Sequence, residues 1–417
     1  MAFDTILVGK FYFQGQFREL EVGIRNGRIE KIGKDLKGGI RKELEGAIFP
    51  AGTDTHVHFR DPGETQKEDF STGTISAAYG GTTTIFDMPN NKTPVLDYVA
   101  FDNKLHAVQS KAYVDFGLYS MFTGKNSQII DKRSSSIKIF LGGSTNSLPV
   151  DDFPDKELKG LRELGKPVVF HGEDAACLAW HKKEYVKSLA EHELSRPELC
   201  ETEAAKTILN LGIGRSLMGH ISTPDSLEIL QGKVKGEVTP HNLLLNVDSE
   251  SGPWGKVNPP LRSRETQEKN LQAYLNGKFD LLSSDHAPHT EHDKEEFPQA
   301  ASGIIGVETR IPLLLALVQK KVLSFEVFYN TAIKNPAEYM GISKGKLEVG
   351  YFADFFSFKP SNIKKLNQER LHSKTPVSPF NEFPVVFPDD VTLRGEFLIE
   401  SGELVEDRIG RHVDDLK

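Results

Sequence analysis

Residues 54–87 read DTHVHFRDPGETQKEDFSTGTISAAYGGTTTIFD and show the pattern that organises the middle of the chain. A short apolar run ends near His58, a loop with Pro and Gly follows, residues 69–79 are helix-like, and a second apolar run ends at Asp87. A strand, a helix and another strand in this order are typical of a βαβ unit with parallel strands. The stretch therefore predicts an α/β fold.

The same alternation continues through the chain, with helix-like segments such as residues 201–211 between the runs. The later apolar runs end near Met121, Leu141, His171, Ile221, His241 and Asp285. Eight candidate strands within about 300 residues match a (β/α)₈ barrel of the TIM type better than an open doubly wound sheet. An open sheet of that kind would be expected to carry a Gly-rich phosphate loop, and neither G-x-G-x-x-G nor a P-loop motif occurs. We expect residues 51–349 to form the barrel.

Both ends of the chain have a different, strand-rich pattern. Residues 6–33 read ILVGKFYFQGQFRELEVGIRNGRIEKIG, in which Asn26-Gly27 between alternating apolar positions predicts a β-hairpin. Residues 345–358 and 391–405 have a similar pattern near the other end. We expect residues 1–50 and 350–417 to form one small, discontinuous β-sandwich domain.

Charge and cysteine content narrow the class of partner and the cellular compartment. The formal net charge is −8 and no Lys/Arg-rich block occurs, which argues against nucleic acid or an anionic membrane and favours a small-molecule substrate. The N-terminus lacks a signal-peptide pattern and the best apolar run, residues 311–318, is too short to span a bilayer, so we expect a cytoplasmic protein. Cys177 and Cys200 offer neither a disulfide framework nor a thiolate metal site, and we expect both to be small buried apolar residues.

Polar residues end several of the candidate strands. His56 and His58 lie two apart and project to the same face of a strand, as two ligands of one metal would, although such a pair is equally typical of hydrogen-bonded histidines. Lys138, in SIKIFL, is flanked by isoleucines where burying an ammonium is costly. Taken alone, it is more typical of a solvated or salt-bridged lysine.

His171, His220 and Asp285 end three further runs, and each of these histidines alone is more typical of a hydrogen-bonded core residue. The coincidence of such residues at five strand ends instead predicts a metal site. Imidazole and carboxylate ligands without cysteine suit Zn²⁺, or Mn²⁺ or Co²⁺. Four histidines and one carboxylate exceed the needs of one catalytic zinc but suit two bridged metals. Lys138 can supply that bridge if its neutral amine adds CO₂ to form a carbamate.

Seven motifs occur in a fixed order: DTHVHFRDPG, DMPN, IKIFLGGSTN, HGED, GHIST, KVNPPLR and SSDHAPHT. This ordered set resembles the amidohydrolase superfamily and, within it, the dihydroorotases, over roughly residues 50–350. The resemblance implies two Zn²⁺ ions bridged by Lys138 as N6-carboxylysine. It also implies that one metal is held by His56, His58 and Asp285, and the other by His171 and His220.

The resemblance further implies the reversible cyclisation of N-carbamoyl-L-aspartate to L-dihydroorotate and water, a step of pyrimidine biosynthesis. A bridging hydroxide would be the nucleophile in ring opening, with Asp285 as general base and then general acid. Arg60, Asn90 and His289 look like the family's carboxylate-binding residues, and Asn258 resembles a substrate-loop position. Alone, an arginine there would be typical of a surface salt bridge, but its position just after the ligand pair favours a substrate carboxylate.

Two features of the sequence leave alternatives open. Some dihydroorotases bridge their metals with an aspartate after the fourth strand, and Asp151 and Asp152 lie in that region, although Lys138 is favoured because it lies within the strand. Residues 142–148, GGSTNSL, suit a mobile lid whose Ser144 or Thr145 reaches the substrate.

Other functions of the same family compete with this interpretation. Dihydropyrimidinases, hydantoinases and allantoinases would use the same metals and Asp285, but their uncharged ring substrates do not need a guanidinium. A non-catalytic dihydroorotase-like partner of aspartate transcarbamoylase would lack metal ligands, and none is missing here. Association with that enzyme and a homo-oligomeric state both remain open, because the sequence decides neither.

Overall fold

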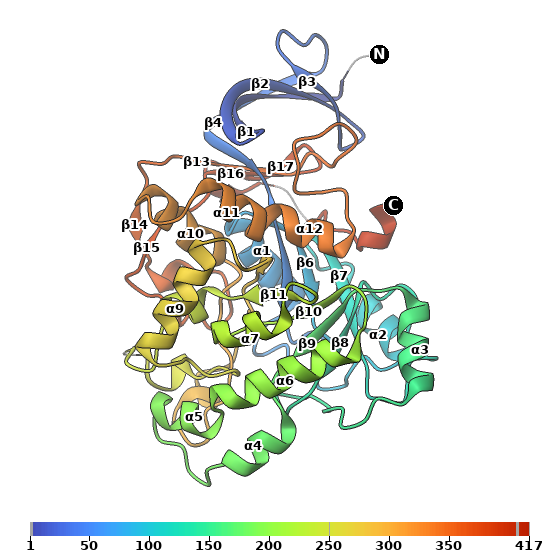
Figure 1. Cartoon of the computed structure of the whole chain (residues 1–417). Helices are drawn as coiled ribbons and strands as arrows, with labels where there is room; N and C mark the ends of the chain where they lie inside the picture. Colours follow the sequence, from blue (N-terminus) through green and yellow to red (C-terminus); the bar gives the residue numbers. More distant parts are fainter. Residues whose placement is uncertain (1–2, 250, 406–407, 417) are drawn as a thin grey trace.

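The central part of the protein is a parallel barrel. The computed structural model describes residues 3–249, 251–405 and 408–416, and among these an eight-stranded parallel sheet runs in the order β12-β11-β10-β9-β8-β7-β6-β5 (Figure 1). Its strands are β5 (Gly52–Val57), β6 (Thr82–Asp87), β7 (Asp115–Met121), β8 (Ser136–Phe140), β9 (Val168–His171), β10 (Ser216–Met218), β11 (Lys235–Val238) and β12 (Leu281–Leu282). A parallel bridge from Val57 to His286 brings the two edges together, so the sheet nearly closes. The TIM-type barrel predicted from the sequence is confirmed.

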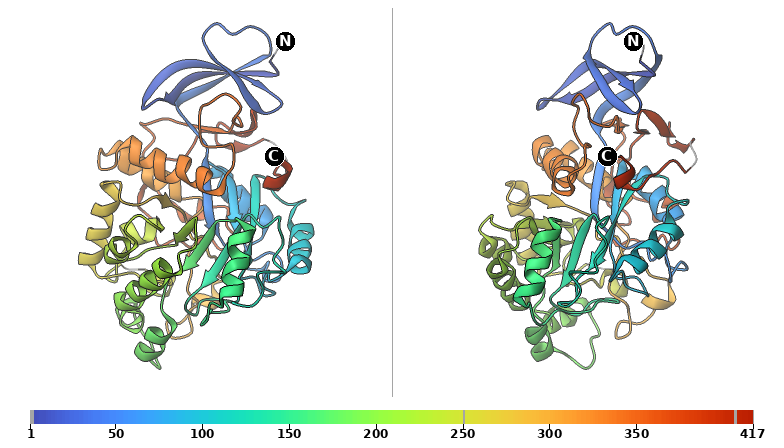
Figure 2. Two further views of the ribbon diagram at one scale, coloured as in Figure 1. Left: turned by 45° about the vertical axis from the view of Figure 1, so that its right-hand side comes forward. Right: turned by 90° about the vertical axis from the view of Figure 1, so that its right-hand side faces the viewer.

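Helices surround the barrel strands (Figures 1 and 2). They are α1 (Phe70–Tyr79), α2 (Tyr98–Val108), α3 (Asp155–Leu164), α4 (Ala175–His181), α5 (Leu189–Ser195), α6 (Glu198–Leu211), α7 (Pro224–Leu230), α8 (Pro240–Leu244), α9 (Arg264–Leu275), α10 (Arg310–Gln319), α11 (Phe325–Tyr329), the π-helix η3 (Asn330–Lys334) and α12 (Asn335–Met340). The predicted helix at residues 69–79 forms because Asp69 caps it, accepting from the backbone N–H of Thr72. None of the described helices is long and apolar enough to cross a membrane.

The barrel strands are buried on both faces, as parallel strands covered by helices usually are. Every residue of β6, β7 and β8 is buried, including the polar Asp87, Asp115 and Lys138. A continuous apolar core between strands and helices includes Phe116 and Phe170. Side chains at the strand ends are therefore held by a rigid, fully packed frame.

Strands from both chain ends form a second sheet, as predicted. Its order is β18-β17-β16-β13-β4-β1-β2-β3. The strands are β1 (Thr5–Phe13), β2 (Gln16–Arg25), β3 (Arg28–Gly33), β4 (Ile40–Pro50), β13 (Phe355–Phe358), β16 (Asp390–Leu393), β17 (Glu396–Glu400) and β18 (Glu403–Leu404), while β14 (Lys364–Lys365) pairs separately with β15 (Pro384–Val385). Asn26 and Gly27 both have positive φ and turn the chain between β2 and β3, as a tight hairpin requires.

This terminal sheet adjoins the N-terminal end of the barrel, because β4 ends at Pro50 and β5 begins at Gly52. Figures 1 and 2 show β1–β3 at one end of the molecule and α4 and α5 at the opposite end. The C-terminal ends of the barrel strands, where active sites of such barrels lie, thus face away from the terminal sheet.

The expectation for the two cysteines was wrong. Cys177 in α4 and Cys200 in α6 form a disulfide. The chain leaves the barrel after β9, builds α4 and α5, and returns so that the two Cα atoms lie 5.2 Å apart. A separation of 23 residues gives no hint of this return.

Candidate metal centre and substrate pocket

The strand ends bring the six predicted metal-binding residues together. His56 lies in β5 and His58 just after it, Lys138 lies in β8, and His171 ends β9. His220 and Asp285 follow β10 and β12. Because the strands are parallel, all of these side chains gather at the C-terminal end of the barrel.

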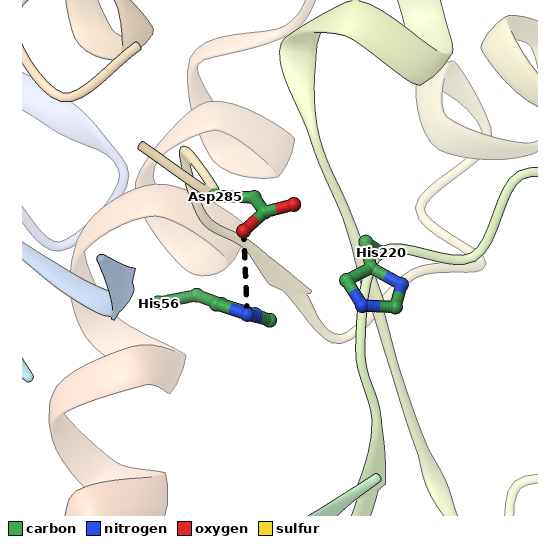
Figure 3. A group of neighbouring side chains, drawn as sticks. All are labelled: His56, His220 and Asp285. Atoms are coloured by element: carbon green, nitrogen blue, oxygen red, sulfur yellow. Dashed lines mark ion pairs between the residues drawn. The ribbon is translucent and has the colours of Figure 1, made fainter. Parts of the chain in front are cut away.

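One group of atoms surrounds the carboxylate of Asp285. Its Oδ1 lies 3.1 Å from Nε2 of His58 and 3.4 Å from Nε2 of His56. His56, His220 and Asp285 each offer a ligand atom, and these atoms lie within 4.8 Å of one another. Figure 3 shows these three side chains converging from separate strands on one space. The spacing suits atoms that share a small cation.

A second group lies beside the first. Nδ1 of His171 is 2.9 Å from Nε2 of His220, and Nζ of Lys138 is 3.4 Å from Nε2 of His56. Lys138 is fully buried, whereas Asp151 and Asp152 are exposed. Lys138 is therefore placed among the histidines, and the two aspartates are not.

The protonation states suit metal ligands. Burial lowers the pKa of His58 to about 3, and it also lowers the pKa values of His171 and His220, so these rings are neutral at pH 7. Burial raises the pKa of Asp285, but the adjacent His56 and His58 outweigh it and hold that pKa well below its usual range. Burial lowers the pKa of Lys138 to about 8, which increases its neutral amine fraction. Neutral imidazoles and an ionised carboxylate are the donor set that a divalent cation needs.

Two buried carboxylates, which the sequence reasoning did not single out, orient the histidines from behind. Nδ1 of His56 donates to Glu237 at 2.8 Å, and Nε2 of His171 donates to Glu173 at 2.9 Å. Each ring thus has one nitrogen bonded outward and the other directed inward. The only sequence signals were an acid inside the short run KGEV at 235–238 and an acid two residues after His171.

A small pocket of about 30 Å³ adjoins the metal-binding residues. Its lining includes His58, Arg60, Asn90, Asn258, Asp285, Ser302 and Gly303. Arg60 is only 3% exposed, and Nη2 of this residue lies 3.5 Å from Nε2 of His289. Oδ1 of Asn258 accepts from Nε2 of His192 at 2.9 Å. The four residues predicted to bind substrate therefore lie in or beside one pocket.

Several polar atoms of this pocket are unsatisfied. Among the described residues, Nε of Arg60, Oδ1 of Asn90 and Nδ1 of His289 have no hydrogen-bond partner, and Arg60 has no ion-pair partner within 4.0 Å. A buried guanidinium without an anion is costly. The pocket is consequently suited to a ligand that carries a carboxylate.

Three of the predicted site residues have strained backbones. Arg60, His220 and Asp285 all have positive φ, in the left-handed region that side chains other than glycine seldom occupy. Such strain often accompanies functional sites, where surrounding structure holds a side chain in one direction.

Loop 142–148 covers one side of the pocket. Ser144 and Thr145 are among the lining residues. Nδ2 of Asn90 donates to the carbonyl of Thr145 at 2.8 Å, and Nδ2 of Asn146 donates to Glu64 at 2.9 Å. These contacts hold the loop against the residues around Arg60.

The barrel, its buried histidines and the carboxylate after the last strand are the arrangement of a metal-dependent hydrolase. The chain belongs to the amidohydrolase family, whose model matches residues 47–389. Two curated proteins, each called dihydroorotase, are similar over 98% of both chains: one from Thermoplasma volcanium at 53% identity and one from Thermoplasma acidophilum at 50%. The resemblance predicted from the motifs is confirmed.

The fold is also similar to solved structures of related hydrolases. An L-hydantoinase (dihydropyrimidinase) from Arthrobacter aurescens superposes with a TM-score of 0.91 at 28% identity, covering 99% of this chain and 100% of its own. A dihydropyrimidinase from Brevibacillus agri gives 0.87 at 26% identity, covering 98% of each chain. The likeness extends over the barrel and the terminal sheet together.

Proposed function

We propose that the protein is a dihydroorotase, which interconverts N-carbamoyl-L-aspartate and L-dihydroorotate. The observation that carries this proposal is Arg60, a buried guanidinium without an ion-pair partner among the described residues. It lies beside the predicted metal-binding residues, which we call the metal-binding group: His56, His58, Lys138, His171, His220 and Asp285. L-Dihydroorotate has a ring carboxylate that pairs with this group, ideally through two hydrogen bonds. Dihydrouracil and hydantoin have no such carboxylate. The two relatives at 50–53% identity, both called dihydroorotase, support the same assignment.

Asn90 and His289 complete the proposed carboxylate pocket. Burial and the charge of Arg60 hold the pKa of His289 far below its usual range, so this ring is neutral and adds no charge to the pocket. Its Nε2 donates to the carbonyl of Ser302 at 3.1 Å, which fixes the ring beside Arg60. Asn258 is oriented by His192 and by the hydroxyl of Ser302, 3.2 Å away. Charge selection therefore rests on Arg60.

Asp285 moves the proton in the proposed reaction. Its lowered pKa keeps it ionised at neutral pH, ready to accept a proton. In ring opening, Asp285 takes a proton from the attacking water and passes it to the amide nitrogen as the C–N bond breaks. In ring closure it takes the proton from the attacking carbamoyl nitrogen and passes it to the departing oxygen of the side-chain carboxyl group, which leaves as water with a second proton taken up from solution.

The donor set fits two divalent metals, for which Zn²⁺ is the first candidate. When bound, such ions polarise the reacting carbonyl and lower the pKa of water to about 7. His56, His58 and Asp285 would hold one, and His171 with His220 the other. Lys138, after its neutral amine adds CO₂ and loses a proton, would supply the two-oxygen bridge. Its burial without a carboxylate within 4.0 Å among the described residues supports that role.

The test is turnover of L-dihydroorotate against dihydrouracil and hydantoin by the purified, metal-loaded protein. We expect chelator-sensitive turnover of dihydroorotate that exceeds the other two. Arg60→Met should raise the KM for dihydroorotate at least tenfold, the cost of about 1.4 kcal/mol in binding. An exposed arginine, Arg264, supplies the control Arg264→Met. Faster turnover of either uncharged ring would overturn the assignment.

A further inference from the structure

Arg196 lies between the metal-binding group and loop 142–148. Its Nε donates to Oε1 of Glu173 at 2.9 Å, and its Nη2 donates to the other carboxylate oxygen. The same Nη2 donates to the carbonyl of Gly143 at 3.1 Å. One guanidinium thus contacts the carboxylate behind His171 and the backbone of the loop over the pocket.

Glu173 orients the ring of His171, and this effect depends on the guanidinium of Arg196. The carboxylate is fully buried; its Oε1 accepts from Arg196, and its Oε2 accepts from both Arg196 and His171. An ionised Glu173 accepts the proton of Nε2 of His171, so Nδ1 keeps its lone pair toward His220. Without Arg196, the buried carboxylate would lose its main partner and the ring would lose its fixed orientation.

The segments that carry Glu173 and Arg196 are joined by a disulfide and by backbone hydrogen bonds. Glu173 precedes α4 and Arg196 precedes α6, and the disulfide between Cys177 and Cys200 links these helices. The backbone N–H of Asp174 donates to the carbonyl of Cys200 at 2.8 Å. The carbonyl of Arg196 accepts from the buried Arg262 at 2.6 Å. The guanidinium is therefore presented from a fixed backbone, whereas loop 142–148 is held by single hydrogen bonds.

We propose that Arg196 is a positioning residue with two effects: through Glu173 it fixes His171 for metal binding, and through Gly143 it holds loop 142–148 over the pocket. The loop effect on substrate binding rests on the proposed function, while the metal effect does not. Of the contacts that Arg196 makes, opening of the loop would break the bond to Gly143 and leave the pair with Glu173 intact. Metal retention and substrate affinity are then separable properties of one side chain.

Three variants separate these effects. In Arg196→Met both contacts are lost, so we expect metal affinity to fall 10- to 100-fold and KM to rise. Arg196→Lys keeps a charge for Glu173 but cannot bond both carboxylate oxygens and Gly143, so it should restore metal affinity and leave KM raised. Glu173→Gln keeps Arg196 in place for Gly143, so it should weaken metal binding with little change in KM. Arg264→Met is the matched control, because Arg264 is exposed and pairs with Asp248, not with Glu173 or loop 142–148.

Metal affinity is measured without substrate, by competition of Zn²⁺ and Co²⁺ with a chelator, and the absorption spectrum of the Co²⁺ protein reports ligand geometry. Thermal melting of each apo-protein checks folding. Wild-type metal affinity and KM in Arg196→Met would overturn the proposal, as would equal losses of both in Arg196→Lys and Arg196→Met. If the wild type binds metal but does not turn over dihydroorotate, the proposed function fails, while the metal measurements still test the role of Arg196.

Discussion

At the scale of single residues, Glu237 shows how a residue outside the pocket controls the site. It is fully buried, accepts from Nδ1 of His56 at 2.8 Å and also accepts from the hydroxyl of Thr55 at 3.0 Å. We expect Glu237→Gln to weaken metal binding 10- to 100-fold, because a neutral amide oxygen holds the His56 ring less firmly and makes it less basic. Metal content after dialysis against a chelator measures the effect. The exposed Glu228→Gln is the control, and unchanged metal content in Glu237→Gln would contradict this role.

Lys294 lies close enough to Arg60 to interact with it electrostatically, and its own charge depends on pH. It is 2% exposed and donates only to carbonyls among the described residues, those of Pro253 and Lys256. Burial and the charges of Lys256 and Arg60 lower its pKa to about 7. Lys294 is therefore positive below pH 7 and becomes neutral as the pH rises.

Deprotonation of Lys294 sets the direction in which the KM for dihydroorotate should change with pH. Loss of the Lys294 charge weakens attraction for an anionic substrate, so KM for dihydroorotate should rise about fivefold between pH 6 and 8.5, the size of a ~1 kcal/mol charge interaction. Lys294→Met should have a high KM at both pH values, without the rise between them that is due to the lysine. The exposed Lys321→Met should keep the wild-type profile. A wild-type profile in Lys294→Met would exclude the lysine as its cause.

At the scale of elements, the disulfide between α4 and α6 closes a 23-residue excursion. Such a crosslink stabilises chiefly by restricting the unfolded chain, by about 3 kcal/mol for a loop of this length. We expect the double variant Cys177→Ala, Cys200→Ala to unfold at lower denaturant concentration than the wild type. Reductant should lower the wild-type midpoint and leave the variant unchanged. A reductant-insensitive wild type would show that the bond does not contribute.

The sequence predicts the elements better than it predicts their mutual contacts. The eight barrel strands end near the expected residues because short runs of apolar residues separated by polar loops are a local signal. Strand geometry alone predicts that His56 and His58 project to the same face, and their prediction as metal ligands needed the other strand ends and the family resemblance. Glu237, Arg196 and the disulfide partners depend on segments that meet only after the chain folds, so no local pattern reports them.

At the scale of the whole molecule, a buried charge cluster joins the barrel to the terminal sheet. Nζ of Lys344, after α12, lies 2.6 Å from Asp115 at the start of β7 and 2.6 Å from Asp354 before β13. Arg394, after β16, also pairs with Asp115, and Asp354 accepts from the hydroxyl of Thr83 in β6 at 2.9 Å. Strands of both sheets thus share one set of charges.

Removal of Lys344 should loosen this junction. Lys344→Met leaves two buried carboxylates short of a cation, for which we expect a loss of about 3–5 kcal/mol in the free energy of unfolding. Lys346→Met breaks the partly exposed pair with Glu338 and the contact with the Tyr351 ring, and should cost less than about 1 kcal/mol. Denaturant midpoints of both variants measure the difference.

The pH dependence of the stability lost in Lys344→Met distinguishes the electrostatic contribution of Lys344 from its packing contribution. Lys344 and Arg394 overcome the effect of burial and lower the pKa of Asp115, so this carboxylate stabilises the fold above its unfolded pKa of about 3.8 and loses that contribution as the pH falls. In Lys344→Met the contribution of Asp115 is already reduced at pH 7. The gap in stability between wild type and variant should therefore shrink below about pH 4, where the unfolded chain binds a proton at Asp115 that the folded wild type binds only at lower pH. A gap that stays constant from pH 7 to 3 would show that Lys344 joins the two sheets by packing alone.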